Sequence, residues 1–245
     1  MAEAAATRPA FYAAQRGGPR DWWTLLHPPY TAWHLSYVVL GACLAPVIDI
    51  TRLIATLGAF FLAVGIAAHA LDELHDRPLR TAIPNRALIA AAVAGLCGAL
   101  FLGLAGVAEL GWLLLVFMAV GVFLVLAYYL EWCGGIIHTD AGFAAAWGCF
   151  PVLTAYFAQA GYLTPVALLA AASAFGLTDA QRSLSNRARH LRRRTRAVHG
   201  WLELANGGQQ GISAAYLLEP LEQALRALSW SLVALATALA VFRLT

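Results

Sequence analysis

The amino-acid sequence predicts an all-α, polytopic membrane protein, built as a bundle of about seven transmembrane helices. Hydrophobic residues make up 61% of the 245 positions and charged residues only 12%, about half the charged share of a typical soluble domain. The mean hydropathy is +0.68. Apolar stretches long enough to cross a bilayer recur along the chain, without the alternation of a barrel strand. Because lipid offers the backbone no hydrogen bonds, these stretches are expected to be helices.

Seven stretches qualify as candidate spans, and several are dense in the small residues that let membrane helices pack closely. Residues 1–26, which precede them, lack the apolar core of a cleavable signal peptide and are interpreted as a cytoplasmic lead. Residues 27–196 would form a helical bundle that carries the polar chemistry. Residues 197–245 would form an amphipathic, interfacial segment and the last span. The candidate spans are residues 30–48, 53–72, 87–107, 110–130, 141–160, 162–178 and 227–244.

The distribution of arginine predicts the orientation. The chain has no lysine, so all 16 positively charged side chains are arginines. Seven alternating spans place the N-terminus and the loops near 73–86, 131–140 and 179–226 on one side, with fourteen of the arginines; only Arg52 and Arg243 fall on the other side. By the positive-inside rule the arginine-rich side is cytoplasmic. This predicts a multi-pass protein of the cell's inner (cytoplasmic) membrane with a cytoplasmic N-terminus.

Acidic residues are concentrated at the end of the second candidate span. Four polar side chains recur there at i, i+3, i+4 and i+7 and share one helical face: His69, Asp72, Glu73 and Asp76. Three carboxylates within two turns repel one another unless they share a cation. Mg²⁺ prefers oxygen ligands and keeps several waters, which leaves positions for a phosphate. Arg77 and Arg80 follow directly, and a guanidinium group matches phosphate oxygens. The alternative is a charged cap that ends the span at the interface.

These residues resemble a known family, the UbiA superfamily of intramembrane prenyltransferases. Its first signature reads N-D-x-x-D-x-x-x-D at the end of the second helix, and residues 68–76 fit that frame, with Asp72 and Asp76 as the second and third acids. Arg77-Pro78-Leu79 resembles the R-P-L loop that follows it. Residues 27–42 and 135–161 are similar to the start of the family's first helix and to its fifth helix, so the resemblance extends over residues 27–196.

The resemblance implies an enzyme with a UbiA-like fold. Mg²⁺, held by Asp72 and Asp76 with Glu73 and His69 as further candidate ligands, would bind a prenyl diphosphate. Arg77 and Arg80 would stabilise the departing diphosphate, and the prenyl group would pass to a lipophilic acceptor, such as an aromatic quinone precursor. Two alternatives stay open. The allylic cation could cyclise without an acceptor, or the chain could be a non-catalytic relative that binds a lipid or a protein partner.

The sequence departs from the family pattern in three places. Glu131 stands where a lysine is expected after the fourth helix, and the second acidic signature keeps one acid, Asp179. Asp179 could be a metal ligand or an ordinary helix cap. Arg182, one turn later, could supply the positive charge of a second Mg²⁺ and is therefore a third candidate catalytic arginine. The family has nine spans, so a partner could complete this shorter bundle as a homo- or hetero-oligomer.

The densest charge run, residues 187–196, holds six of the arginines. As the cytoplasmic continuation of the sixth span, it is expected to lie against anionic lipid headgroups, at about 1 kcal/mol per residue. No aromatic residues are interleaved in the run to stack on bases. We therefore expect no nucleic-acid partner.

The predicted orientation can be tested by labelling. A cysteine placed at position 80 or 193 should resist a membrane-impermeant thiol reagent added outside intact cells, because both positions fall on the predicted cytoplasmic side. Strong labelling at either position would reverse the orientation and move the acidic face to the other side of the membrane.

Overall fold

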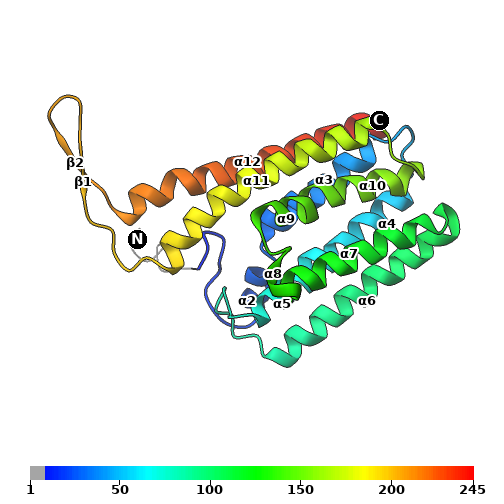
Figure 1. The fold of residues 1–245 in the computed structure, drawn as a ribbon, viewed down its shortest axis with the longest axis horizontal. Helices are drawn as coiled ribbons and strands as arrows, with labels where there is room; N and C mark the ends of the chain where they lie inside the picture. Colours follow the sequence, from blue (N-terminus) through cyan, green and yellow to red (C-terminus); the bar gives the residue numbers. More distant parts are fainter. Residues whose placement is uncertain (1–8) are drawn as a thin grey trace.

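The computed structural model describes residues 9–245 and confirms a predominantly α-helical architecture (Figure 1). The first eight residues of the predicted lead, Arg8 among them, lie outside the described residues. The long helices run side by side along the long axis of the molecule. Within the described part of the chain, the strands are two three-residue segments that pair as an antiparallel hairpin, β1 (Trp201–Glu203) and β2 (Gln209–Gly211).

Consecutive helical segments join into longer continuous helices, which we call rods. Two of the rods contain a π-helical segment between α-helical ones. The first rod joins α4, η1 and α5, and the second joins α9, η2 and α10. The helices, in chain order, are α2 (Pro19–Leu25), α3 (Pro28–Cys43), α4 (Ile50–Phe60), η1 (Phe61–Ala68), α5 (His69–Leu74), α6 (Asn85–Leu110), α7 (Leu113–Tyr129), α8 (Trp132–Gly135), α9 (Asp140–Ala144), η2 (Ala145–Cys149), α10 (Phe150–Ala160), α11 (Pro165–Arg193) and α12 (Ala214–Leu244).

Four helical rods in residues 9–245 are long and apolar enough to cross a membrane: Ile50–Leu74, Asn85–Leu110, Asp140–Ala160 and Ala214–Leu244. They correspond to four of the seven predicted spans. The surface is also apolar where lipid would lie, with Phe101 73% and Phe242 76% exposed. Such side chains are costly in water and ordinary against lipid tails. The chain is thus mostly helical, with four rods suited to a membrane, and the count of seven spans stays a prediction.

The C-terminal third differs in detail from the predicted segments. Most of the sixth predicted span and the arginine run as far as Arg193 form one continuous helix, α11. The predicted amphipathic segment contains the β1–β2 hairpin and the first turns of α12, which begins where the Ser213 side chain accepts a hydrogen bond from the Tyr216 N–H. Pro220 lies inside α12 without ending it. Near its start α12 is fixed to α11 by a buried ion pair, 2.5 Å between Arg192 Nε and Glu222 Oε1.

Helix α3 lies at the centre of the bundle and packs against α10 and α12. Gly41 makes the contact with α10 possible, because a Cβ there would overlap the Val152 carbonyl oxygen and lie 2.9 Å from the Val152 Cα. On another face of α3, the buried Tyr37 hydroxyl donates to the Ala174 carbonyl at 3.2 Å and accepts from the Thr178 hydroxyl at 3.0 Å. These bonds tie α11 to α3.

The two ends of the bundle differ in charge. One end gathers the first described residues, α2, the loop after α5, α8 and the β1–β2 hairpin, and the other holds the C-terminus (Figure 1). Arg52 and Arg243 lie at the C-terminal end, where they contact Glu109 at 3.2 Å and the Ala45 carbonyl at 2.9 Å. The polar segments predicted to share one side of the membrane therefore do lie at one end of the fold.

The close α3–α10 contact predicts an effect on stability. Gly41→Ala should lower the free energy of unfolding by roughly 1–3 kcal/mol, because the added methyl group overpacks a backbone contact. Gly176→Ala is the matched control on α11, since nothing lies within 4 Å of the added Cβ and alanine is the better helix former. Thermal unfolding in detergent measures both. Equal stability of the two variants would contradict the packing described for α3.

Candidate functional site

At the arginine-rich end, Asp72 of α5 lies within electrostatic range of a row of arginines on α11. It interacts with Arg189 and Arg193, and more weakly with Arg182. The three arginines are spaced by seven and four residues, so they share one face of α11. We call Asp72, Arg182, Arg189 and Arg193 the polar centre. Asp140 of α9 also pairs with Arg182, so three guanidinium groups meet two carboxylates and the positive charge is in excess.

Contacts from two other helices fix Arg182. Its Nε donates to Asp140 Oδ1 at 2.8 Å, and its Nη2 donates to the Tyr128 hydroxyl at 3.1 Å. Its guanidinium group lies 4.5 Å from the centroid of the Phe143 ring, a distance at which the cation is attracted to the ring face. Asn186, one turn further along α11, also donates to Asp140 at 3.0 Å. Arg182 is therefore held in place before any ligand binds.

Arg189 lies deeper in the polar centre. Burial, together with the neighbouring guanidinium groups of Arg182 and Arg193, lowers the pKa of the Arg189 side chain. It donates to the Asn186 side-chain oxygen. Arg193 Nε donates to the Pro9 carbonyl at 3.2 Å, so the N-terminal segment covers that edge. Crowded guanidinium groups of this kind would be stabilised by a bound anion.

His69 lies beside the polar centre but is already packed. It is buried, its Nδ1 lies 3.2 Å from the Gly65 carbonyl oxygen, and its ring stacks on His27 with centroids 4.3 Å apart. His27 Nδ1 in turn pairs with the Tyr12 hydroxyl at 2.5 Å. Burial, followed by the nearby His69, lowers the pKa of His27. The structure thus places His69 in a buried aromatic stack.

The predicted acidic face does not continue past α5, because that helix ends at Leu74. Glu73 is fully buried and turns into the following loop. Its Oε2 accepts from the Leu79 N–H at 2.9 Å, and its Oε1 accepts from the Thr81 N–H at 2.8 Å and the Thr81 hydroxyl at 2.9 Å. Asp76 is exposed, with a left-handed backbone at φ 61°. The two acids are not presented together with Asp72 on one helical face.

The other predicted residues are also separated. Arg77 clamps its own loop, with its Nη1 donating to the Ile83 carbonyl at 2.6 Å and its Nη2 bonded to Asn85. Arg80 is exposed, and Asp179 is exposed on α11 beside the buried Thr178. Of the predicted site residues, Asp72 and Arg182 alone come together in the polar centre. Among the described residues, no group of three or more His, Cys, Asp or Glu could hold a metal ion.

Sequence reasoning missed Arg189, Arg193 and Asp140. The two arginines were assigned to lipid headgroups with the rest of the run, although their spacing from Arg182 already placed all three on one helical face. Asp140 gave no such signal, because its contacts with Arg182 and Asn186 join residues more than forty positions apart. Of the run itself, Arg187, Arg194 and Arg196 are exposed at the surface.

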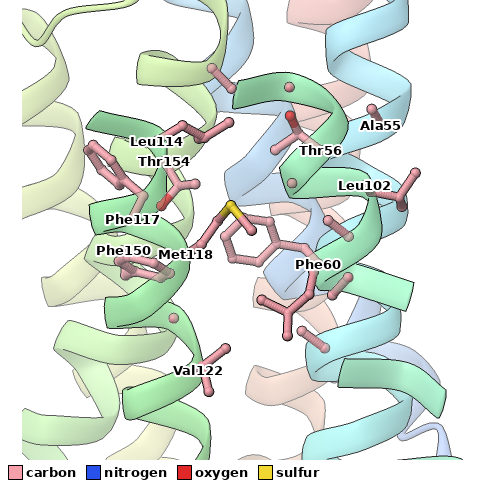
Figure 2. Close-up of a pocket in the computed structure, with 18 of the residues that line it drawn as sticks. Ala55, Thr56, Phe60, Leu102, Leu114, Phe117, Met118, Val122, Phe150 and Thr154 are labelled. Carbon is pink, nitrogen blue, oxygen red and sulfur yellow. The ribbon is translucent and has the colours of Figure 1, made fainter. Parts of the chain in front are cut away.

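An apolar cavity of about 240 Å³ lies between the first rod, α6, α7 and α10 (Figure 2). Trp147 of η2 lines it and also contacts Tyr128 and Tyr129, with ring centroids 6.1 and 6.0 Å apart. Tyr128 binds Arg182, and Phe143 packs on both Tyr128 and Trp147. We call Tyr128, Tyr129, Phe143 and Trp147 the aromatic wall. It lies between the cavity and the polar centre.

Comparisons with protein families, curated proteins and solved structures found no match for this chain. The chemistry of the polar centre is therefore argued from its own residues.

The hydrogen bonds that Glu73 accepts predict how its replacement by glutamine would affect stability. Glu73→Gln should lower the free energy of unfolding by roughly 1.5–3 kcal/mol, because an NH₂ group would replace a charged oxygen that accepts from the backbone. Thermal unfolding and protease cleavage within residues 75–84 report the change. Glu203→Gln, on the exposed strand β1, is the control. Unchanged stability with lost Mg²⁺ binding would instead make Glu73 a metal ligand.

Proposed function

We propose that this protein is a membrane prenyltransferase-like enzyme that binds a prenyl diphosphate at the polar centre and transfers the prenyl group to a lipophilic acceptor. The observation that carries the proposal is the polar centre itself. Three arginines share one face of α11 near the two acids Asp72 and Asp140, next to the aromatic wall. A multiply charged anion with an apolar tail matches that combination.

The first step is recognition of the diphosphate. A diphosphate carries several negative charges, and guanidinium groups bind its oxygens in charge-assisted pairs. Arg182 is already oriented by Asp140 and Tyr128, so little side-chain entropy is lost on binding. Arg189 and Arg193 would supply the remaining positive charge, and a bound anion would relieve the repulsion among the three.

The residues support a limited role for Mg²⁺. Asp72 is the acid left for a metal ion, because Asp140 pairs with Arg182, Glu73 binds its loop and Asp179 is exposed. A single carboxylate suits an ion that keeps waters and takes most of its other ligands from a phosphate. Bound there, Mg²⁺ would add positive charge beside the leaving group. The same residues do not form the pair of facing acidic motifs that a two-metal site requires.

The second step is departure of the leaving group. The carbon–oxygen bond breaks, its electron pair leaves with the diphosphate, and the arginines stabilise the charge that develops. The allylic cation that remains would be shielded by the faces of the aromatic wall. An electron-rich carbon of the acceptor then forms the new bond and loses a proton. Without an acceptor the cation would cyclise, which makes terpene cyclisation a variant of the same chemistry.

The second candidate function is binding without catalysis, of a lipid phosphate or a partner. One observation favours it: two of the residues expected to hold metal and diphosphate, Glu73 and Arg77, are bonded to their own loop instead. In that case the polar centre would retain an anionic headgroup, and the aromatic wall would have no cation to shield.

The membrane arrangement that we propose is the same for either function and is based on the distribution of the arginines. We propose that α3, α7 and α11 cross the bilayer together with the four longer rods, and that the polar centre faces the cytoplasm. The 16 residues of α3 rise about 24 Å, so its ends would lie near the two interfaces. The exposed Arg187, Arg194 and Arg196 would contact anionic headgroups of the inner membrane. A homo- or hetero-oligomeric partner could complete the bundle.

Binding is tested first. Purified protein with Mg²⁺ should be stabilised against thermal unfolding by geranyl diphosphate. Asp72→Asn should abolish the Mg²⁺-dependent part of that stabilisation with little change in the fold, since it removes a charge and almost no volume. Asp179→Asn is the matched control, because Asp179 is exposed on α11. Equal behaviour of the two variants would remove Asp72 from the proposed site.

Turnover separates the two candidate functions. The enzyme should release diphosphate from at least one member of a panel of prenyl diphosphates of ten to fifty carbons, with or without aromatic acceptors. Arg182→Ala should slow release by roughly 10²–10³-fold and weaken binding less, because its contact strengthens as the leaving group gains charge. Binding without release from any substrate would leave the non-catalytic function.

A further inference from the structure

The cavity of Figure 2 contains two polar atoms with unused bonding capacity. Within the described part of the chain, Trp147 Nε1 and Thr154 Oγ1 are buried and have no hydrogen-bond partner, and both side chains line the cavity. Trp147 is 3% exposed. Buried polar groups are nearly always paired, and an unpaired one carries a free-energy cost. Both residues therefore point to an absent hydrogen-bonding group inside the cavity.

Most of the other residues that line the cavity are apolar, and they come from helices far apart in the sequence. Phe60 of α4, Phe117 and Met118 of α7 and Phe150 of α10 surround the space (Figure 2). An engineered apolar cavity of about 150 Å³ holds a benzene ring, so the volume of about 240 Å³ has room for about ten non-hydrogen atoms. The ligand that fits is a small lipophilic molecule or a short apolar chain.

A buried water molecule would not satisfy the hydrogen bonds of these two polar atoms. They lie seven residues apart on one continuous rod, which corresponds to about 10 Å along a helix. A single buried water needs two to four polar partners within its own reach, and one water cannot reach both of these atoms. A ligand oxygen carried on an apolar body can bond to one of the two groups and bury its remainder against the wall.

The charges at the outer mouth exclude an anionic ligand. Arg52 and Glu109 line the cavity there, but they pair with each other at 3.2 Å, and Arg52 Nη1 also donates to the Gln159 carbonyl at 3.3 Å. Their charges offset one another. No unpaired charge among the described lining residues remains to attract a phosphate or an ammonium group, so the ligand should be neutral.

The backbone around the cavity is irregular in two places. Val64 lies in η1 and Trp147 in η2, and both line the cavity. π-Helical segments are rare and occur frequently at functional sites. Here the two π-helical segments lie where the two rods line the cavity, next to the aromatic wall.

We infer that this cavity is a second binding site, for a neutral lipophilic molecule that carries one hydrogen-bonding oxygen, such as a ketone or an alcohol. Thr154 offers a donor and an acceptor, and Trp147 offers a donor. The site is separate from the polar centre, because the aromatic wall lies between them. The inference therefore does not depend on the proposed function.

A pair of nine-carbon probes tests the site. 2-Nonanone and nonane, added to the detergent-purified protein at equal mole fraction in the micelle, differ chiefly in the oxygen. The ketone should raise Tm more, with an apparent Kd roughly two- to tenfold lower than that of nonane, the contribution of one net hydrogen bond. Thr154→Val together with Trp147→Phe should remove the difference. Equal effects of both probes on the native protein would overturn the inference.

Filling the cavity gives an independent test. Ala99 of α6 lines the cavity, and Ala94 is exposed on the same helix. Ala99→Phe should abolish the response to both probes, while Ala94→Phe should keep it. Persistence of the response in Ala99→Phe would place the ligand elsewhere.

The polar centre is tested in the same assay. Asp72→Asn should leave the response to 2-nonanone unchanged, whatever its effect on diphosphate binding. Loss of the ketone response in Asp72→Asn would show that the two sites are one, and would overturn their separation.

Discussion

The contact between α3 and α10 at Gly41 determines how the other rods are arranged. The two backbones touch there with no side chain between them, and α3 also carries Tyr37, whose hydroxyl bonds to the Ala174 carbonyl and to Thr178 of α11. Helices in lipid gain little from hydrophobic burial against one another, so close van der Waals contact and interhelical hydrogen bonds hold them together. The position of α3 therefore fixes the position of the second rod (α9, η2 and α10) and the position of α11 along its own axis.

That axial position decides where the arginines lie. With Thr178 bonded to α3, Arg182 reaches Asp140 and Tyr128, and Arg189 comes opposite Asp72. Further along, Arg192 pairs with Glu222 of α12 in a buried contact of 2.5 Å. Neighbouring arginines of one run thus have different surroundings. Arg192 enters an ion pair with an acid of another helix, Arg189 and Arg193 lie near Asp72, and others face outward.

Much of the fold, and less of the site, could be predicted from the sequence. The length of the apolar stretches and the absence of alternation predicted helices, and the structure confirms a mostly helical chain with four rods long and apolar enough to span a membrane. Asp72 and Arg182 were predicted and do come together. The role of Glu73 could not be read from helical spacing, because it depends on the chain folding back after Leu74 so that Leu79 and Thr81 donate to it. Asp140 depends on a contact between distant segments. Neither π-helical segment has a local sequence signal.

The position of η1 has a consequence for insertions and deletions. This segment, Phe61–Ala68, immediately precedes His69 and the turn that carries Asp72. A π-helix accommodates more residues per turn than an α-helix, and each residue of an α-helix advances the side-chain direction by about 100°. A π turn holds about one residue more than the α turn it replaces, so loss of one residue from η1 would return the rod to α-helical spacing and keep the direction of Asp72. Loss of one residue from the preceding α4 would instead rotate everything after it by about 100° around the axis, and Asp72 would turn away from α11. The number of residues in an apolar α-helical segment inside the bundle is thus what aims a charged side chain, and η1 is the part of this rod that can lose one residue.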